Sequence, residues 1–270
     1  MSVSPQRILI FVGMLGLLVQ LAGCAGLPGN EAADVAAAEL YKEGRAAIRH
    51  GDYASGVELL STLIRRYPYN RTVEPARLQL AFALFKSGQA EKAIDRLEEY
   101  IKLYPDSKNL AYAYYLRGLA ALEISNAELA DFMGRPPEAN ALASSRRSFD
   151  YLSQLAQKFP RSRYFDDAVK KIGELRDAMA RYEVHAANYF LKQGHFETAI
   201  DRAEYVTRYY ARSPQVPDAF AIMIKAWLKL GQRQKAQDTL NMLEMNFADV
   251  PATQDARRVF DQYVAQLEAD

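Results

Sequence analysis

Cysteine is almost absent from this sequence, and tryptophan and histidine are scarce. The 270 residues include one cysteine, one tryptophan and three histidines. A single cysteine excludes an internal disulfide, and His50, His185 and His195 show no spacing typical of a metal centre. Excess charge of either sign is also lacking, because the formal net charge is +1. This balance argues against nucleic acid as a partner, because nucleic-acid binding would call for a basic face.

The long apolar run of the sequence lies at its start. Residues 1–23 carry one charge, Arg7, followed by an apolar run from Ile8 to Leu21. A basic start, an apolar stretch and small residues behind it are typical of a secretory signal peptide. The alternative is a transmembrane helix, since about 17–25 apolar residues span a bilayer. Glycines interrupt this run, however, and no positive cluster follows it.

The lone cysteine directly follows this stretch. Leu21-Ala22-Gly23-Cys24 resembles the lipobox of bacterial lipoproteins, and the resemblance implies cleavage before Cys24 and lipidation of that residue. Ala25 in place of an aspartate favours the outer membrane over the inner one by the same resemblance. The residues after Cys24 are small, polar and interrupted by proline and glycine, so residues 24–36 are predicted to be the lipidated cysteine and a tether. Beyond this covalent lipid, no cofactor is predicted.

Four stretches of the remaining chain repeat with one period. Gly51 and Gly88 are 37 residues apart, as are Gly194 and Gly231, and the prolines that close these stretches keep the same spacing. Such a period indicates a solenoid. The glycine is predicted to form the turn between two helices, the following apolar residues have helical spacing, and the closing proline is expected to end the second helix.

Small residues at one register strengthen this interpretation. Gly56, Ala93, Ala199 and Ala236 each lie five positions after the turn glycine, where two helices must approach closely. The pattern resembles the tetratricopeptide repeat, although the period is 37 residues and not the usual 34. We therefore predict an all-α, tetratricopeptide-like α-solenoid of about five helix-turn-helix repeats over residues 37–251, with a C-terminal capping helix. The N-terminal repeats and an insertion are assigned to residues 37–141, and the C-terminal repeats and cap to residues 142–270.

The middle repeat is less regular. Residues 112–122 are predicted to form its first helix, with Gly118 at the position where the helices cross, and residues 144–160 its second. The stretch between them, "EISNAELADFMGRPPEANAL", is expected to be an inserted loop, and loops of this kind often lie on a binding face.

Catalytic motifs are missing from the sequence. It has no phosphate-binding glycine loop, serine nucleophile elbow or zinc-protease pattern. Acidic pairs such as Glu98-Glu99 have basic neighbours and are predicted to be solvated helix faces. We therefore predict no enzyme, no catalytic residue and no metal site.

Longer stretches resemble a known family. They are "YPYN" after the first repeat, "AIDRLEEYIKLYPDSKNLAYAYYLRGL", "ADFMGR" and "YFDDAVKKIGELRDAMARYEVHAANYFLKQGHFETAIDRAE". They resemble the BamD (ComL) family of lipoproteins, which belong to the complex that inserts β-barrel proteins into the outer membrane. The resemblance implies a scaffold lipid-anchored on the periplasmic face of the outer membrane. Its implied partners are the POTRA domain of BamA, other Bam lipoproteins and unfolded outer-membrane β-barrel proteins.

The resemblance also implies site residues. Arg202 in "AIDRAEY" matches a family arginine on the BamA side. The alternative is an ordinary solvated helix residue, since Arg96 holds the same register in "AIDRLEE". The N-terminal repeats of the family are implied to receive the aromatic-ended C-terminal signal of unfolded barrel proteins. Tyr67, Phe82 and Phe85 are candidates for that groove by region only. A repeat lipoprotein for type IV pilus assembly and an envelope-constriction scaffold are the alternatives.

Overall fold

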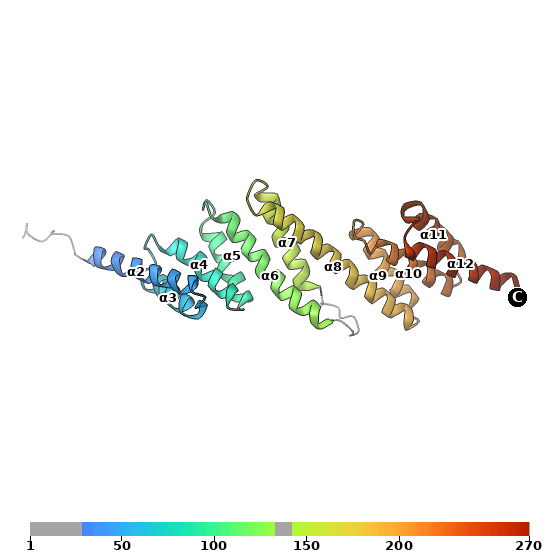
Figure 1. The fold of residues 1–270 in the computed structure, drawn as a ribbon, viewed down its shortest axis with the longest axis horizontal. Coiled ribbons are helices and arrows are strands. Elements are labelled where there is room, and N and C mark those ends of the chain that lie inside the picture. Colours follow the sequence, from blue (N-terminus) through green and yellow to red (C-terminus); the bar gives the residue numbers. More distant parts are fainter. Residues whose placement is uncertain (1–28, 133–141, 270) are drawn as a thin grey trace, which may run out of the picture. The chain divides into compact units, whose positions relative to one another are not determined.

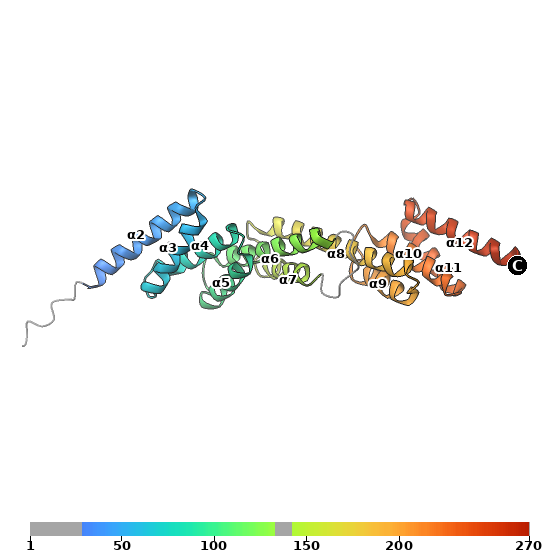
Figure 2. The same ribbon diagram turned by 90° about the horizontal axis from the view of Figure 1, so that it is seen from below.

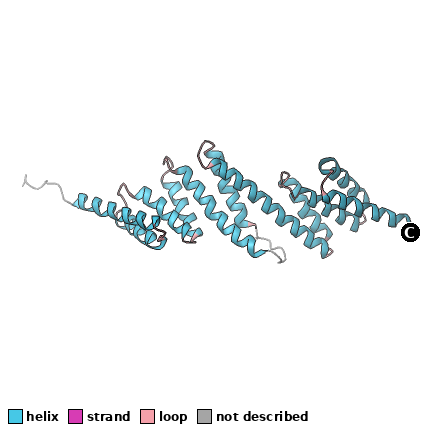
Figure 3. Ribbon diagram, viewed as in Figure 1, coloured by secondary structure: helices cyan, strands magenta, loops and turns pink. Residues whose placement is uncertain are grey.

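The computed structural model describes residues 29–132 and 142–269, and within them every regular element is a helix (Figures 1 and 3). The helices in chain order are α2 (Gly29–Arg49), α3 (Tyr53–Arg66), α4 (Val73–Lys86), α5 (Ala90–Leu103), α6 (Leu110–Phe132), α7 (Ala143–Lys158), α8 (Phe165–Lys192), α9 (Phe196–Tyr209), α10 (Val216–Lys229), α11 (Arg233–Phe247) and α12 (Pro251–Ala269). Five successive helix pairs and a final helix confirm the predicted tetratricopeptide-like class. No helix within the described ranges has both the length and the apolar character needed to cross a membrane.

The chain forms two compact units. The first covers residues 1–83, where α2 packs on α3, and the second covers residues 84–270. In the second unit each helix from α5 onward packs on the next, and α6 and α7 lie side by side in both ribbon views (Figures 1 and 2). The predicted boundary between residues 141 and 142 falls between these two helices of the second unit. That division into N-terminal and C-terminal repeats stays a prediction.

The turn glycines adopt the conformation that the repeat predicted. Gly51, Gly88, Gly194 and Gly231 have φ of 81°, 74°, 81° and 70°, a left-handed conformation that costs a residue with a Cβ. Each turn closes with the same two hydrogen bonds. At Gly231, for example, the glycine N–H donates to Leu228 O (3.0 Å) and the next N–H to Trp227 O (2.9 Å). This is a Schellman motif, which satisfies the last carbonyls of the first helix.

Small residues lie where the helices cross, as expected. Ala93, Ala199 and Ala236 are fully buried, and a Cβ added to Gly56 would lie 2.8 Å from Cγ1 of Ile48. The tightest crossing is at Gly118 in α6, where an added Cβ would lie 2.7 Å from Cγ of Leu152 in α7. These crossings allow each helix pair to close.

The prediction that a proline ends each second helix is only partly confirmed. Pro68, Pro105 and Pro160 directly follow the capping residues Tyr67, Tyr104 and Phe159, so the expected helix stop is confirmed there. By contrast, α9 ends at Tyr209 and α11 at Phe247, each before its proline is reached, and Pro251 is the first residue of α12. Proline suits a first helical position because that residue's N–H has no partner within the helix.

Two expected irregular stretches are partly helical. The inserted loop was expected to start at residue 123, but α6 continues to Phe132 because its polar residues find partners on α7. Ser125 Oγ lies 2.6 Å from Ser145 Oγ, and Ser144 Oγ donates to Glu128 Oε1 at 3.0 Å. The tether expected up to residue 36 is helical from Gly29, where alanines and acidic residues favour a helix.

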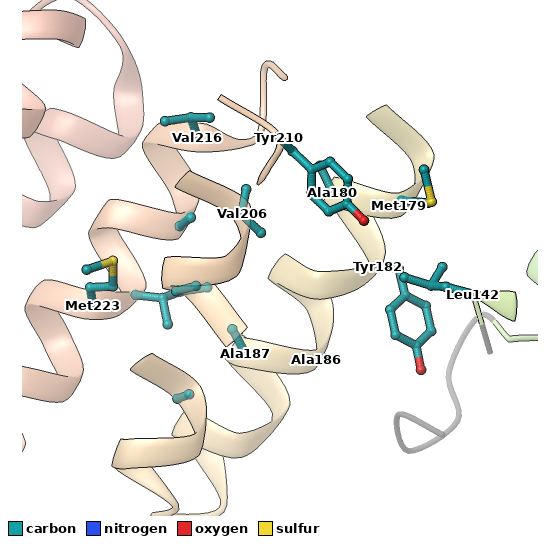
Figure 4. Packing of buried hydrophobic residues seen from close by; sticks show 14 residues of the cluster. Leu142, Met179, Ala180, Tyr182, Ala186, Ala187, Val206, Tyr210, Val216 and Met223 are labelled. Carbon is teal, nitrogen blue, oxygen red and sulfur yellow. The ribbon is translucent and has the colours of Figure 1, made fainter. Parts of the chain in front are cut away.

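A large cluster of the core joins α8, α9 and α10 (Figure 4). Alanines at the centre of the contact, among them Ala186, Ala187 and Ala203, are fully buried. They let the backbones approach, and larger residues such as Met179, Val206 and Met223 fill the space around them. Arg202, which the sequence singled out, lies on α9 beside this core.

Candidate protein-binding sites

Arg202 lies at the edge of this core and is held by a buried carboxylate. Its Nη1 donates to Oε2 of Glu183 in α8 at 2.9 Å. Glu183 is 2% exposed, whereas the Arg202 side chain is 34% exposed. Arg146 in α7 approaches the other carboxylate oxygen, with Nη2 3.8 Å from Oε1. One buried acid therefore receives two arginines from neighbouring helices, and each arginine also reaches solvent.

A tyrosine pair lies next to this ion-pair cluster. Burial, with Tyr205 as a lesser cause, raises the pKa of Tyr210 to about 12, so Tyr210 is a neutral hydrogen-bonding group at physiological pH. The charge at the cluster comes from the arginines and Glu183. Because burying an unpaired carboxylate is costly, Glu183 fixes where the two guanidinium groups lie.

Arg96 differs from Arg202 despite sharing its register. It pairs with Glu99 on the same helix at 3.1 Å, and the two side chains are 55% and 37% exposed. A pair of this kind contributes at most about 1 kcal/mol to stability. Of the two arginines, Arg202 alone is anchored by a buried acid, so Arg96 serves as its control.

Tyr67 lines a groove in the first unit. The groove has a volume of about 580 Å³ and lies between the start of α2 and the segment that joins α3 to α4. Beside Tyr67 it is lined by Tyr69, which is fully exposed, and by the exposed Arg66 and Arg71. Asn70 Nδ2 donates to Asp34 Oδ1 at 2.5 Å across it. Aromatic faces and two guanidinium groups therefore share one open site.

Phe82 does not share this groove with Tyr67. The Phe82 ring packs edge-on against Tyr53, with 6.4 Å between centroids, and Tyr53 is the first residue of α3 while Tyr67 caps its end. At about 1.5 Å of rise per residue, the length of α3 separates them by roughly 20 Å. Phe85 belongs to the second unit. The role of these three residues in substrate binding stays a prediction.

Cys24 lies outside the described residues, so its lipidation stays a prediction. Several residues of the two sites were missed from sequence, namely Arg66, Tyr69, Arg71, Arg146 and Glu183. Glu183 could have been found from the sequence, because it lies four residues after Met179 on the apolar face of α8. A lone acid at a core-facing position indicates a buried partner.

Residues 33–243 match the family described as YfiO, outer membrane lipoprotein. The chain belongs to this family. It is 31% identical over 254 residues to outer membrane protein assembly factor BamD of Neisseria meningitidis serogroup A, with 91% of this chain and 93% of that protein covered. It is also 28% identical over 249 residues to the BamD of Xylella fastidiosa strain Temecula1, with 92% and 84% covered.

Solved structures resemble the chain more distantly. The MamA protein has 18% identity and a TM-score of 0.40, with 80% of this chain and 96% of that one covered. A thermophilic TPR protein of Thermus thermophilus has 12% identity and a TM-score of 0.37, with 85% and 100% covered. The helix pairs and their glycine turns themselves define the tetratricopeptide-like fold.

Proposed function

We propose that this protein is a lipid-anchored scaffold subunit of the outer-membrane β-barrel assembly complex. The observation that carries the proposal is the match, over nine-tenths of the chain, to relatives named outer membrane protein assembly factor BamD. In this proposal Cys24 carries the lipid that holds the protein at the periplasmic face of the outer membrane. The repeats bind the POTRA domain of BamA, other Bam lipoproteins and unfolded β-barrel proteins, and no catalysis is required of them.

The cluster around Arg202 supports a BamA-facing role. Two guanidinium groups beside one buried acid form a partly exposed cationic surface. Since only one nitrogen of Arg202 bonds Glu183, other N–H groups remain to pair with a carboxylate on the POTRA domain. A partner that meets prearranged arginines loses little side-chain entropy on binding.

Three variants separate binding from folding at this cluster. Arg202→Ala should weaken binding to purified BamA POTRA domain by at least about tenfold, which corresponds to a lost interfacial charge pair. Glu183→Gln loosens the anchor of Arg202 but leaves its guanidinium available to a partner, so it should weaken binding less than Arg202→Ala does. Arg96→Ala should leave binding unchanged. Equal losses in Arg202→Ala and Glu183→Gln would mean that Arg202 acts only by holding the core together.

The groove at Tyr67 supports a substrate role for the first unit. An unfolded barrel protein whose chain ends in an aromatic residue offers an aromatic ring and a terminal carboxylate. Tyr67 and Tyr69 provide aromatic contact area at low entropic cost, and Arg66 and Arg71 suit a carboxylate. Phe82 and Phe85 stay candidates by region only.

A peptide pair tests this groove. A peptide that ends in phenylalanine with a free carboxylate should bind several-fold more tightly than the same peptide amidated at its C-terminus. Tyr69→Ala should weaken the free-carboxylate peptide, whereas Tyr209→Ala, which alters an exposed tyrosine of the second unit, should not. Equal binding of both peptides would refute recognition of the chain end.

A further inference from the structure

A second groove lies among the last helices of the chain. Its volume is about 680 Å³, and it is lined mainly by α10 and α12, with the end of α8 and the start of α9 at one side. Its apolar wall includes Leu191, Leu228, Val259 and Tyr263. None of its lining residues belongs to the sites assigned above.

Helix α12 packs on the core with some residues and borders the groove with others. Ala256 and Phe260 are buried in the core shared by α10, α11 and α12. Val259 and Tyr263, one helical turn apart, pack against the edge of that core and also line the groove while remaining partly exposed. A terminal helix with a wholly polar outer face would close a repeat protein. Here α12 instead leaves a partly apolar strip open.

The charges in the groove are of one sign. Lys225 and Lys229 lie one turn apart on α10 and line it, and no acidic residue does. Neither lysine has a carboxylate within ion-pair distance anywhere in residues 29–132 and 142–269. By comparison, Lys235 nearby on α11 rests over the Trp227 ring at 4.3 Å. The two groove lysines therefore present uncompensated positive charge beside apolar surface.

From this juxtaposition we propose that the groove docks an acidic amphipathic helix of a partner protein. Apolar side chains of that helix pack on Leu228, Val259 and Tyr263. Two of its carboxylates, one turn apart, pair with Lys225 and Lys229, because residues i and i+4 on both helices have the same separation of about 5–6 Å. A helix lying in an apolar groove is a recurring recognition mode. The inference stands apart from the assembly role proposed above.

The test uses the full-length protein in detergent and two synthetic helical peptides. Both peptides carry leucines at i, i+3, i+4 and i+7. One has two glutamates beside that face at i+1 and i+5, and the other has glutamines there. Fluorescence anisotropy of labelled peptides gives the affinities. The glutamate peptide should bind at least about fivefold more tightly than the glutamine peptide, and the difference should shrink as salt is added.

Charge reversal locates the binding. Lys225→Glu/Lys229→Glu should abolish the preference for the glutamate peptide. Lys102→Glu/Lys108→Glu makes the same change in net charge at exposed lysines elsewhere in the second unit and should retain it. Lys229→Gln alone, at an exposed position, provides a variant that keeps the fold and should lose part of the preference. Circular dichroism of each variant checks that its helices are intact.

Three outcomes would overturn the proposal. Equal affinity for the two peptides would remove the role of the lysines. Equal loss in both double variants would indicate nonspecific charge attraction. Self-association that disappears when residues 267–270 are deleted would make the chain's own acidic tail the occupant in place of a partner helix.

Discussion

Gly118 provides the sharpest test of how the helix pairs are packed. Alanine is normally the better helix former, so Gly→Ala within a helix stabilises by about 0.5–1 kcal/mol. At Gly118 the new Cβ would lie 2.7 Å from Cγ of Leu152, well inside normal contact distance. Leu152 is fully buried, so moving its side chain away would disturb the close packing around it. The steric penalty therefore decides the sign of the change.

The size of the effect follows from the cost of overpacking. An extra methyl group in a filled core costs about 1–3 kcal/mol, which exceeds the propensity gain. Gly118→Ala should lower the free energy of unfolding by about 1–2 kcal/mol. The matched control is Gly173→Ala in α8, where the nearest atom to an added Cβ is Nη2 of Arg176 at 4.0 Å. That variant should be more stable than the parent by about 0.5–1 kcal/mol.

Urea unfolding of the two variants, followed by circular dichroism, measures both changes. Both glycines lie in the second unit, so the same transition reports on each. The midpoint should fall for Gly118→Ala and rise for Gly173→Ala, with the m-value unchanged. A Gly118→Ala variant as stable as the parent would refute the close crossing of α6 and α7.

Three further changes test other parts of the fold. Gly88→Ala meets no atom within 4 Å but keeps a φ of 74°, so strain alone should cost about 1–2 kcal/mol in thermal or urea unfolding; an unchanged stability would contradict the left-handed turn. The pKa of Asp167 lies below its ordinary value, chiefly because Tyr115 donates a hydrogen bond to it at 2.5 Å. This pair stabilises the fold above the ordinary carboxyl pKa of about 4 and loses that effect as pH falls through the lowered pKa. Tyr115→Phe should therefore raise the carboxyl pKa seen by NMR and destabilise at pH 7 more than at pH 3, and a pH-independent loss would argue against it. Arg202→Ala leaves the buried Glu183 without its 2.9 Å partner and should cost about 1–3 kcal/mol, part of which Glu183→Gln should restore in a double-mutant cycle; full additivity would show that the two do not interact.

The repeat skeleton was predictable because its signals are local. A glycine at fixed spacing requires only that one backbone position be left-handed, and all four predicted glycines have positive φ. The small residue five positions later is equally local, since it faces the other helix of the same pair. Pro214 and Pro251 show the limit of such rules, because each lies closer to the start of the following helix than to the end of the preceding one.

The sites were less predictable because they depend on contacts between distant residues. The link between Arg202 and Glu183 joins two helices, and Arg146 comes from a third. No local sequence pattern predicts which arginine pairs with which acid. Likewise, Tyr67 and Phe82 are close in sequence, but α3 places them near its opposite ends. Proximity along the chain therefore does not show which residues line one groove.

The shared acid at Glu183 also constrains how this protein can change over evolutionary time. Loss of one arginine leaves the carboxylate poorly paired, and loss of the carboxylate leaves two cations facing each other, so single substitutions at positions 146, 183 and 202 are each penalised. Exchange of the whole set for apolar residues of similar volume is the path that keeps the core stable. Among related sequences, substitutions at these three positions should therefore occur together, and sequences in which only one or two of them are changed should be rare. If Arg202 binds a partner as proposed, that partner would then have to change with all three.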